Sequence, residues 1–144
     1  MIKVEHTVTI RRPVNDVFAF ITNILNFPRW MGEVIKKSWA LDEGAMGVGF
    51  RFGQTAQFLG RQVETQFIVT EYTPDVRFCV QSTTGPIPFE GCFDFEAVPE
   101  GTRFTNRSRV TAEGLVRLAQ PVLAATIERQ VQIDTIYLRI LLER

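Results

Sequence analysis

Side chains that can exchange a proton near neutral pH are scarce in this sequence. The one histidine, His6, lies in an alternating segment, residues 2–11, on the row that also carries Val4 and Val8. A histidine in such a row acts as acid or base at a pocket wall, or packs in the core with one hydrogen bond. The spacing leaves both interpretations open.

An arginine interrupts the main apolar stripe expected for the last helix. Arg129 falls among residues spaced for one helical face, namely Leu118, Val122, Ala125, Ile133, Ile136 and Ile140. Facing a cavity, its guanidinium would hold a carboxylate, phenolate or enolate; otherwise it would pair with Glu71 or a backbone carbonyl, or extend to an edge. Arg129 and His6 are therefore the candidate catalytic residues, although no acid–base pair is recognisable from spacing.

The cysteines are the other reactive side chains. Two scattered cysteines and one histidine make no metal-ligand pattern, so we expect no metal and no cofactor. Cys79 and Cys92 would face each other across a hairpin centred on Gly85-Pro86, on the face away from any pocket. In the cytoplasm both thiols are expected to be reduced.

Charge and hydropathy argue against two classes of partner. Sixteen basic and sixteen acidic residues cancel, and no Lys/Arg-rich block is present to neutralise phosphates, so we expect no nucleic-acid partner. No apolar run approaches the ~20 residues of a membrane span, and the N-terminus lacks the layout of a signal peptide. We expect no membrane insertion, a cytoplasmic location and one domain over residues 1–144.

Alternation with a period of two predicts seven strands. After residues 2–11 they lie near 34–42, 48–59, 62–73, 76–84, 88–98 and 102–112, and short turns between the later ones indicate antiparallel neighbours. Helical spacing predicts short helices after Pro13 and Asn26, and a long helix over 114–143. This is an α+β fold: a curved antiparallel sheet around a long C-terminal helix, with two short helices between the first two strands.

The outward-facing positions of the last two strands carry complementary charges. Acidic residues of one strand are expected to face basic residues of the next on a solvated surface: Glu90, Asp94 and Glu96 opposite Arg103, Arg107 and Arg109.

One helix is too narrow to cover the inner face of seven strands. A helix is ~10 Å across, whereas seven strands span about six gaps of ~4.8 Å. The remaining interior is a cavity, or the 12 phenylalanines fill it. Polar residues on the covered face, with Gln54, Thr65 and Ser82 expected side by side, favour a cavity. The candidate ligand-binding residues are Phe50, Phe52, Gln54, Thr65, Phe67, Phe78, Val80, Ser82, Phe93, Phe104, Asn106, Ser108, Arg129 and Ile133.

Motifs along nearly the whole chain carry a resemblance to a known family. They are Val8-Thr9-Ile10 with Arg12-Pro13, Val17-Phe18-Ala19-Phe20-Ile21-Thr22, Asn26-Phe27-Pro28-Arg29-Trp30, Phe58-Leu59-Gly60-Arg61, Val69-Thr70-Glu71-Tyr72-Thr73-Pro74, Gly85-Pro86-Ile87-Pro88, Gly101-Thr102-Arg103 and the stretch from Asp134 to Glu143. With these the chain resembles the polyketide cyclase/dehydrase and lipid-transport family of the helix-grip (START-like, SRPBCC) superfamily. The resemblance implies that fold, an inward arginine on the last helix as a ligand anchor, and tasks as diverse as polyketide cyclisation, lipid carriage and hormone sensing.

Three functions follow from the sequence. The first is binding of a small, mostly apolar ligand (lipid, aromatic or polyketide-like) between sheet and helix. The second is a cyclase or dehydratase that positions a flexible chain, with Arg129 stabilising an enolate and His6 moving a proton. The third is protein interaction, for example as a homodimer, through the second apolar side of the long helix. That helix has a second apolar set, roughly opposite the first: Leu123, Ile127, Val131, Leu138 and Leu141.

Overall fold

The order of strands and helices along the chain is the one expected from the sequence. The computed structural model describes residues 1–58 and 60–144, apart from the side chains of residues 58, 115 and 116. The last residue of the predicted strand 48–59 lies outside the described residues. The strands are β1 (Ile2–Ile10), β2 (Ile35–Ala40), β3 (Arg51–Phe58), β4 (Arg61–Thr73), β5 (Arg77–Ser82), β6 (Phe89–Val98) and β7 (Gly101–Val110).

Helices follow the first and the last strand. They are α1 (Val14–Thr22), η1 (Ile24–Asn26), α2 (Phe27–Trp30), η2 (Gly114–Ala119) and α3 (Gln120–Leu142). The long helix begins next to Pro121, which suits a first turn because its missing N–H would be unpaired there in any case. Asn26 precedes α2 as predicted, but its side chain does not cap that helix; Asn23 instead accepts a hydrogen bond from the backbone of Leu25 in η1.

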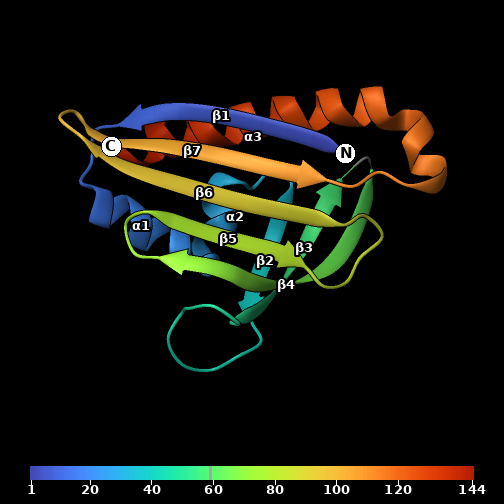
Figure 1. The fold of residues 1–144 in the computed structure, drawn as a ribbon, viewed down its shortest axis with the longest axis horizontal. Coiled ribbons are helices and arrows are strands. Elements are labelled where there is room, and N and C mark those ends of the chain that lie inside the picture. The colour runs from blue at the N-terminus through green and yellow to red at the C-terminus, as the bar shows by residue number, and fades with distance from the viewer. Residues whose placement is uncertain (59) are drawn as a thin grey trace.

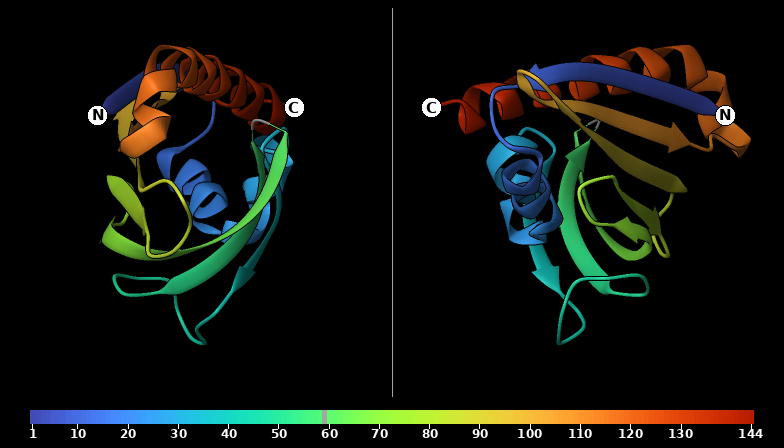
Figure 2. Two further views of the ribbon diagram at one scale, coloured as in Figure 1. Left: turned by 90° about the vertical axis from the view of Figure 1, so that its right-hand side faces the viewer. Right: turned by 60° about the vertical axis from the view of Figure 1, so that its left-hand side comes forward.

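The strands form one antiparallel sheet in the order β1-β7-β6-β5-β4-β3-β2. In Figure 1, α3 runs along β1 and β7, at one edge of this sheet. Figure 2 shows the sheet curling, with α1 and α2 inside the curl. The predicted helix-grip arrangement, a curved seven-stranded antiparallel sheet around a long C-terminal helix, is confirmed.

Side chains on the outer face form the predicted cross-strand ion pairs. Asp94 Oδ1 accepts a hydrogen bond from Arg77 Nε at 2.6 Å. Asp94 Oδ2 lies 2.7 Å from Arg107 Nε, so the two opposite charges form an ion pair, although the N–H of Arg107 is not aligned for a hydrogen bond. The other pairs are Glu96–Arg103 at 3.0 Å and Glu90–Arg109 at 3.7 Å. Exposed pairs of this kind contribute only about 0.2–1 kcal/mol each.

The cysteines lie directly opposite each other, as their spacing predicted. Cys79 of β5 is the register partner of Cys92 in β6. They are joined by a disulfide, so the expectation of two reduced thiols is wrong for this structure. Cross-strand neighbours on one face bring their Cβ atoms close enough for such a bond.

Aromatic side chains fill one end of the interior. Phe104 of β7 is fully buried, with its ring centroid 5.4 Å from Phe95, 5.9 Å from Phe93 and 6.2 Å from Trp30 of α2. Phe18 of α1 packs edge-on against Phe95 at 5.1 Å. These contacts attach the short helices to the sheet and close that end of the core.

The long helix packs on the sheet with the second of its two apolar sets. Its buried residues are Leu123, Ile127, Val131, Asp134, Thr135 and Leu138. The set expected to face the interior is largely exposed: Leu118 is 82% exposed, Val122 66% and Ile140 49%. Both sets have helical spacing, so the periodicity could not distinguish the covered side. The second set was also the expected contact for protein interaction; because it is buried against the sheet, that placement is wrong, and a homodimer stays a prediction.

Within residues 1–58 and 60–144, no helix combines the length and the hydropathy that crossing a membrane requires.

We expect Phe104→Ala to lower the free energy of unfolding by about 3–5 kcal/mol, because it removes a fully buried ring and leaves a cavity. Urea unfolding followed by circular dichroism measures this change. Val48→Ala, at a residue that is 68% exposed, is the control and should change stability by less than about 0.5 kcal/mol. Similar losses for both variants would contradict the assignment of Phe104 to the core.

Candidate functional site

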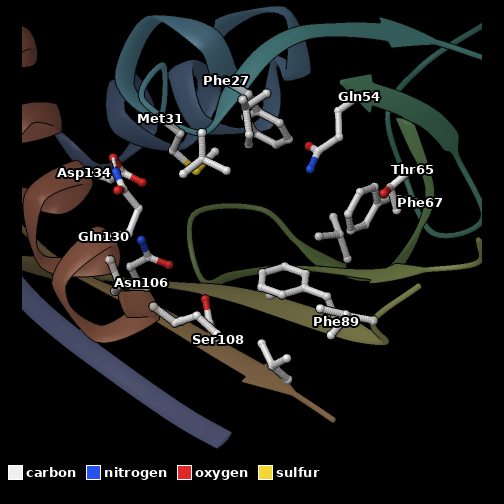
Figure 3. A pocket seen from close by; sticks show the side chains of 18 of the residues that line it. Phe27, Met31, Gln54, Thr65, Phe67, Phe89, Asn106, Ser108, Gln130 and Asp134 are labelled. Atoms are coloured by element: carbon white, nitrogen blue, oxygen red, sulfur yellow. Dashed lines mark hydrogen bonds between the residues drawn. The ribbon is translucent and has the colours of Figure 1, made fainter. Parts of the chain in front are cut away.

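A cavity of about 240 Å³ lies between the inner face of the sheet and the N-terminal half of α3 (Figure 3). This volume is just below the ~300–1,000 Å³ usual for small-molecule sites. Most of the wall is apolar, and these residues are Phe27, Met31, Val34, Ile35, Phe52, Val63, Phe67, Val80, Pro86, Ile87, Phe89, Gly91, Phe93, Val110, Leu123, Ile127 and Val131. The cavity therefore favours a ligand that is itself mostly apolar.

The position of the cavity follows from what covers the sheet. The long helix lies along β1 and β7, and the short helices with their aromatic contacts cover the far end of the curl (Figures 1 and 2). Inward-facing residues of β3 to β6 lie between these two covers, for example Phe67 and Val80. The gap that one helix leaves over a wide sheet is thus the binding space.

Polar side chains form the part of the wall where α3 meets β7. Gln130 Nε2 donates to Asp134 Oδ1 at 2.8 Å, and Asn106 Nδ2 donates to Thr135 Oγ1 at 3.2 Å. Ser108 follows Asn106 on the inner row of β7. Among the described residues, no hydrogen bond reaches Asn106 Oδ1, Ser108 Oγ or Asp134 Oδ2. None of these three atoms is among the fully buried side-chain atoms without a partner, so each is open to the cavity, where water or a ligand can bond to it.

Asp134 is the ionisable group of this wall. Its side chain comes from the buried face of α3, and only 6% of the residue is exposed. Desolvation by burial raises the pKa of Asp134 to about 7, helped by the negative charge of Glu33 and opposed by the hydrogen bond from Gln130. A carboxyl group with this pKa is populated in both protonation states near neutral pH and can therefore take up or release a proton.

A second polar pair lies across the cavity. Gln54 and Thr65 are register partners on β3 and β4, and both line the cavity as drawn in Figure 3. Ser82, expected beside them, instead pairs in register with Phe67 and accepts a hydrogen bond from the backbone of Phe89 at 2.9 Å. Among the described residues, the polar lining on this side thus consists of Gln54 and Thr65.

The residues predicted to bind ligand divide into two groups. The structure places the following on the cavity wall: Phe52, Gln54, Thr65, Phe67, Val80, Phe93, Asn106 and Ser108. Phe78 and Phe104 are fully buried in the aromatic core, Phe50 packs against that core, and Ile133 is on a different side of α3 from the buried residues. Alternation assigns a residue to a face, but it does not tell where along the strand the cavity lies.

The candidate catalytic residues do not reach the cavity. Arg129 belongs to the side of α3 that faces solvent, so its predicted inward placement is wrong. His6 is half-buried on β1 opposite Asn106, but it is not part of the cavity wall, because α3 lies over β1. The cyclase mechanism expected from the sequence therefore lacks both of its groups at this site.

Asp134 and Gln130 were missed as site residues, although the sequence holds a signal for Asp134. It lies three residues after Val131 and seven after Ile127, in step with the apolar set that is buried. A carboxylate in phase with a buried stripe is uncommon without a partner, and it marks a candidate functional position. The signal depends on knowing which stripe faces the sheet.

Within the part of the chain that the structure describes, no group of three or more histidine, cysteine or acidic side chains could hold a metal ion.

With this geometry in place, comparison with known proteins assigns the family. The family model described as "Polyketide cyclase / dehydrase and lipid transport" matches residues 1–135. The chain belongs to this family. A comparison with curated proteins finds no match.

Solved structures share the fold at low sequence identity. The Zhui aromatase/cyclase from Streptomyces sp. R1128 is 19% identical, with a TM-score of 0.81 over 99% of this chain and 93% of that one. TTHA0849 from Thermus thermophilus is 18% identical, with a TM-score of 0.79 over 95% and 94%. The di-domain aromatase/cyclase BexL of the BE-7585A biosynthetic pathway is 17% identical, with a TM-score of 0.77 over 99% of this chain and 50% of that one. These likenesses support the fold.

We expect Asp134→Asn to change how stability depends on pH. Burial raises the pKa of Asp134 from 3.8 to about 7, so the folded state holds this proton more tightly than the unfolded state. The wild-type protein should lose stability relative to the variant as pH rises from about 4 to about 7, by at most about 4 kcal/mol, and the difference should then level off. Urea unfolding at each pH measures this.

The comparison of Asp134→Asn with the wild type is internally controlled, because the two proteins differ in only one titrating group. Parallel stability profiles for the two proteins would contradict a buried Asp134 with a raised pKa.

Proposed function

We propose that this protein binds a small, mostly apolar ligand of the lipid, aromatic or polyketide-like class in the cavity between the sheet and α3. The observation that carries the proposal is the cavity itself: it is apolar over most of its wall and polar at two places. Membership of a family of polyketide cyclases and lipid-transport proteins supports the same class of ligand.

The packing of the wall supports a preformed site. Phe52 and Phe67 stack in parallel with centroids 5.3 Å apart, and Phe89 packs edge-on against Phe67 at 6.1 Å. Rings held in this way present fixed apolar surfaces, so a ligand does not have to order them on binding. The polar atoms without protein partners, on Asn106, Ser108 and Asp134, then orient the ligand.

Filling the cavity should abolish binding. Val63 lies on the cavity wall, whereas its neighbour Glu64 is exposed on the outer face of the same strand. We expect Val63→Trp to weaken binding of the neutral fluorescent ketone Prodan by at least about tenfold, because the indole occupies the ligand's space. Glu64→Trp adds the same side chain outside the cavity and should leave the affinity within about twofold.

Fluorescence titration measures these affinities, and thermal shift against fatty acids, phenols and polycyclic aromatics extends the test to other classes, since a bound ligand stabilises the folded state. Equal effects of the two tryptophans, or no thermal shift with any of these compounds, would contradict the proposal.

A catalytic use of the same cavity is a second candidate, and one observation favours it. Asp134 places a carboxyl group with a pKa of about 7 against the ligand space. Its carboxylate could remove a proton from the carbon between two carbonyl groups and return it after the enolate has reacted, as cyclase chemistry requires. The enolate oxygen would then accept hydrogen bonds from side-chain amides of the wall, such as that of Gln130.

This candidate predicts proton exchange on a simple diketone. With benzoylacetone in deuterated buffer, the wild-type protein should accelerate deuterium incorporation at the central carbon, observed by NMR, and Asp134→Asn should lose most of that acceleration while still binding the compound. Exchange at the same rate with both proteins would exclude Asp134 as the base and leave the binding function.

A further inference from the structure

The cavity has a marked asymmetry of charge. Of the described residues that line it, Asp134 alone carries an ionisable side chain, and no lysine, arginine or histidine is among them. Two arginines on the elements that border the cavity are engaged or exposed. Arg29 of α2 donates to Asn26 and lies over the ring of Phe20, and Arg129 faces solvent. A negatively charged ligand would find no cation at this wall.

At the wall formed by Asp134 and Asn106, two hydrogen-bond acceptors have no partner among the described residues. Thr135 uses its own hydrogen to donate to the backbone carbonyl of Val131 at 2.6 Å, so it must accept the bond from the Asn106 amide. That fixes the Asn106 carbonyl oxygen as the end without a partner among the described residues. Likewise, Gln130 donates to one oxygen of Asp134 and leaves the other, again an acceptor.

From this arrangement we propose that the pocket selects neutral ligands carrying a hydrogen-bond donor, such as a hydroxyl or a primary amide, at the wall formed by Asp134 and Asn106, and that it rejects carboxylates. The inference rests on the proposed binding function and narrows its ligand class. A carboxylate ligand has no donor for these acceptors, and its charge would be buried beside that of Asp134 without a counter-ion.

Three naphthalene compounds of similar size test this inference. The compound 2-naphthamide is neutral with a donor, methyl 2-naphthoate is neutral without one, and 2-naphthoate is an anion without one. Calorimetric titration at about pH 8, above the pKa of about 7 for Asp134, should rank them in that order, with the amide at least about tenfold tighter than the anion.

Replacing the carboxylate of Asp134 should reduce the preference of the pocket for 2-naphthamide over 2-naphthoate. Asp134→Asn removes the charge and adds an amide donor of nearly the same shape, so 2-naphthoate should gain at least about threefold in affinity relative to 2-naphthamide. Glu100→Gln makes the same change of net charge in the exposed turn between β6 and β7, outside the cavity wall, and should leave the ratio unchanged. Thermal unfolding of both variants confirms that they fold.

The outcomes separate the inference from the function on which it rests. If 2-naphthoate binds the wild-type protein as tightly as 2-naphthamide, or if Glu100→Gln shifts the ratio as much as Asp134→Asn, the donor-selective pocket is wrong and the binding function stands. If none of the three compounds binds while Prodan does, the inference is likewise overturned. If neither Prodan nor any naphthalene compound binds, the proposed function itself fails.

Discussion

The structure depends on a mismatch of width between one helix and seven strands. Among the described residues, the long helix covers the sheet mainly along β1 and β7, and the remaining strands need another cover. Aromatic residues of the short helices, such as Phe18 and Trp30, provide it at one end of the curl. Covering the strands between these two ends would need a further helix or strand, and the described residues form none there. The cavity is what remains of the concave face.

The same mismatch sets the chemistry of the site. Asp134 is on the buried face of α3, but the uncovered strands opposite leave one of its oxygens without a protein partner. Burial disfavours the charged form, whereas the open space keeps the group in reach of a ligand or water. A helix packed fully against the sheet would have required at this position an apolar residue or a polar one with all its hydrogen bonds made, as Thr135 has. The cavity thus permits a carboxyl group in the interior and leaves that group able to bond to a ligand or water.

Much of the sheet could be predicted from the sequence because strand pairing there is local. Strict alternation identifies the covered face, and short turns determine which strands are neighbours. Register then follows from counting back from each turn, so the opposition of Cys79 and Cys92 and the pairing of Glu96 with Arg103 were both within reach. The disulfide was not, because the oxidation state of a cysteine pair is not contained in its spacing.

The sequence by itself determined the elements, their order and a concave face too wide for one helix, because these depend on local periodicity and chain length. Tertiary structure decided the rotation of α3, since two apolar stripes of similar quality competed and only packing against β1 and β7 selected one. That rotation turned Arg129 to solvent and Asp134 inward. It replaced a predicted cationic anchor with a buried carboxyl group, through contacts between residues far apart in the sequence.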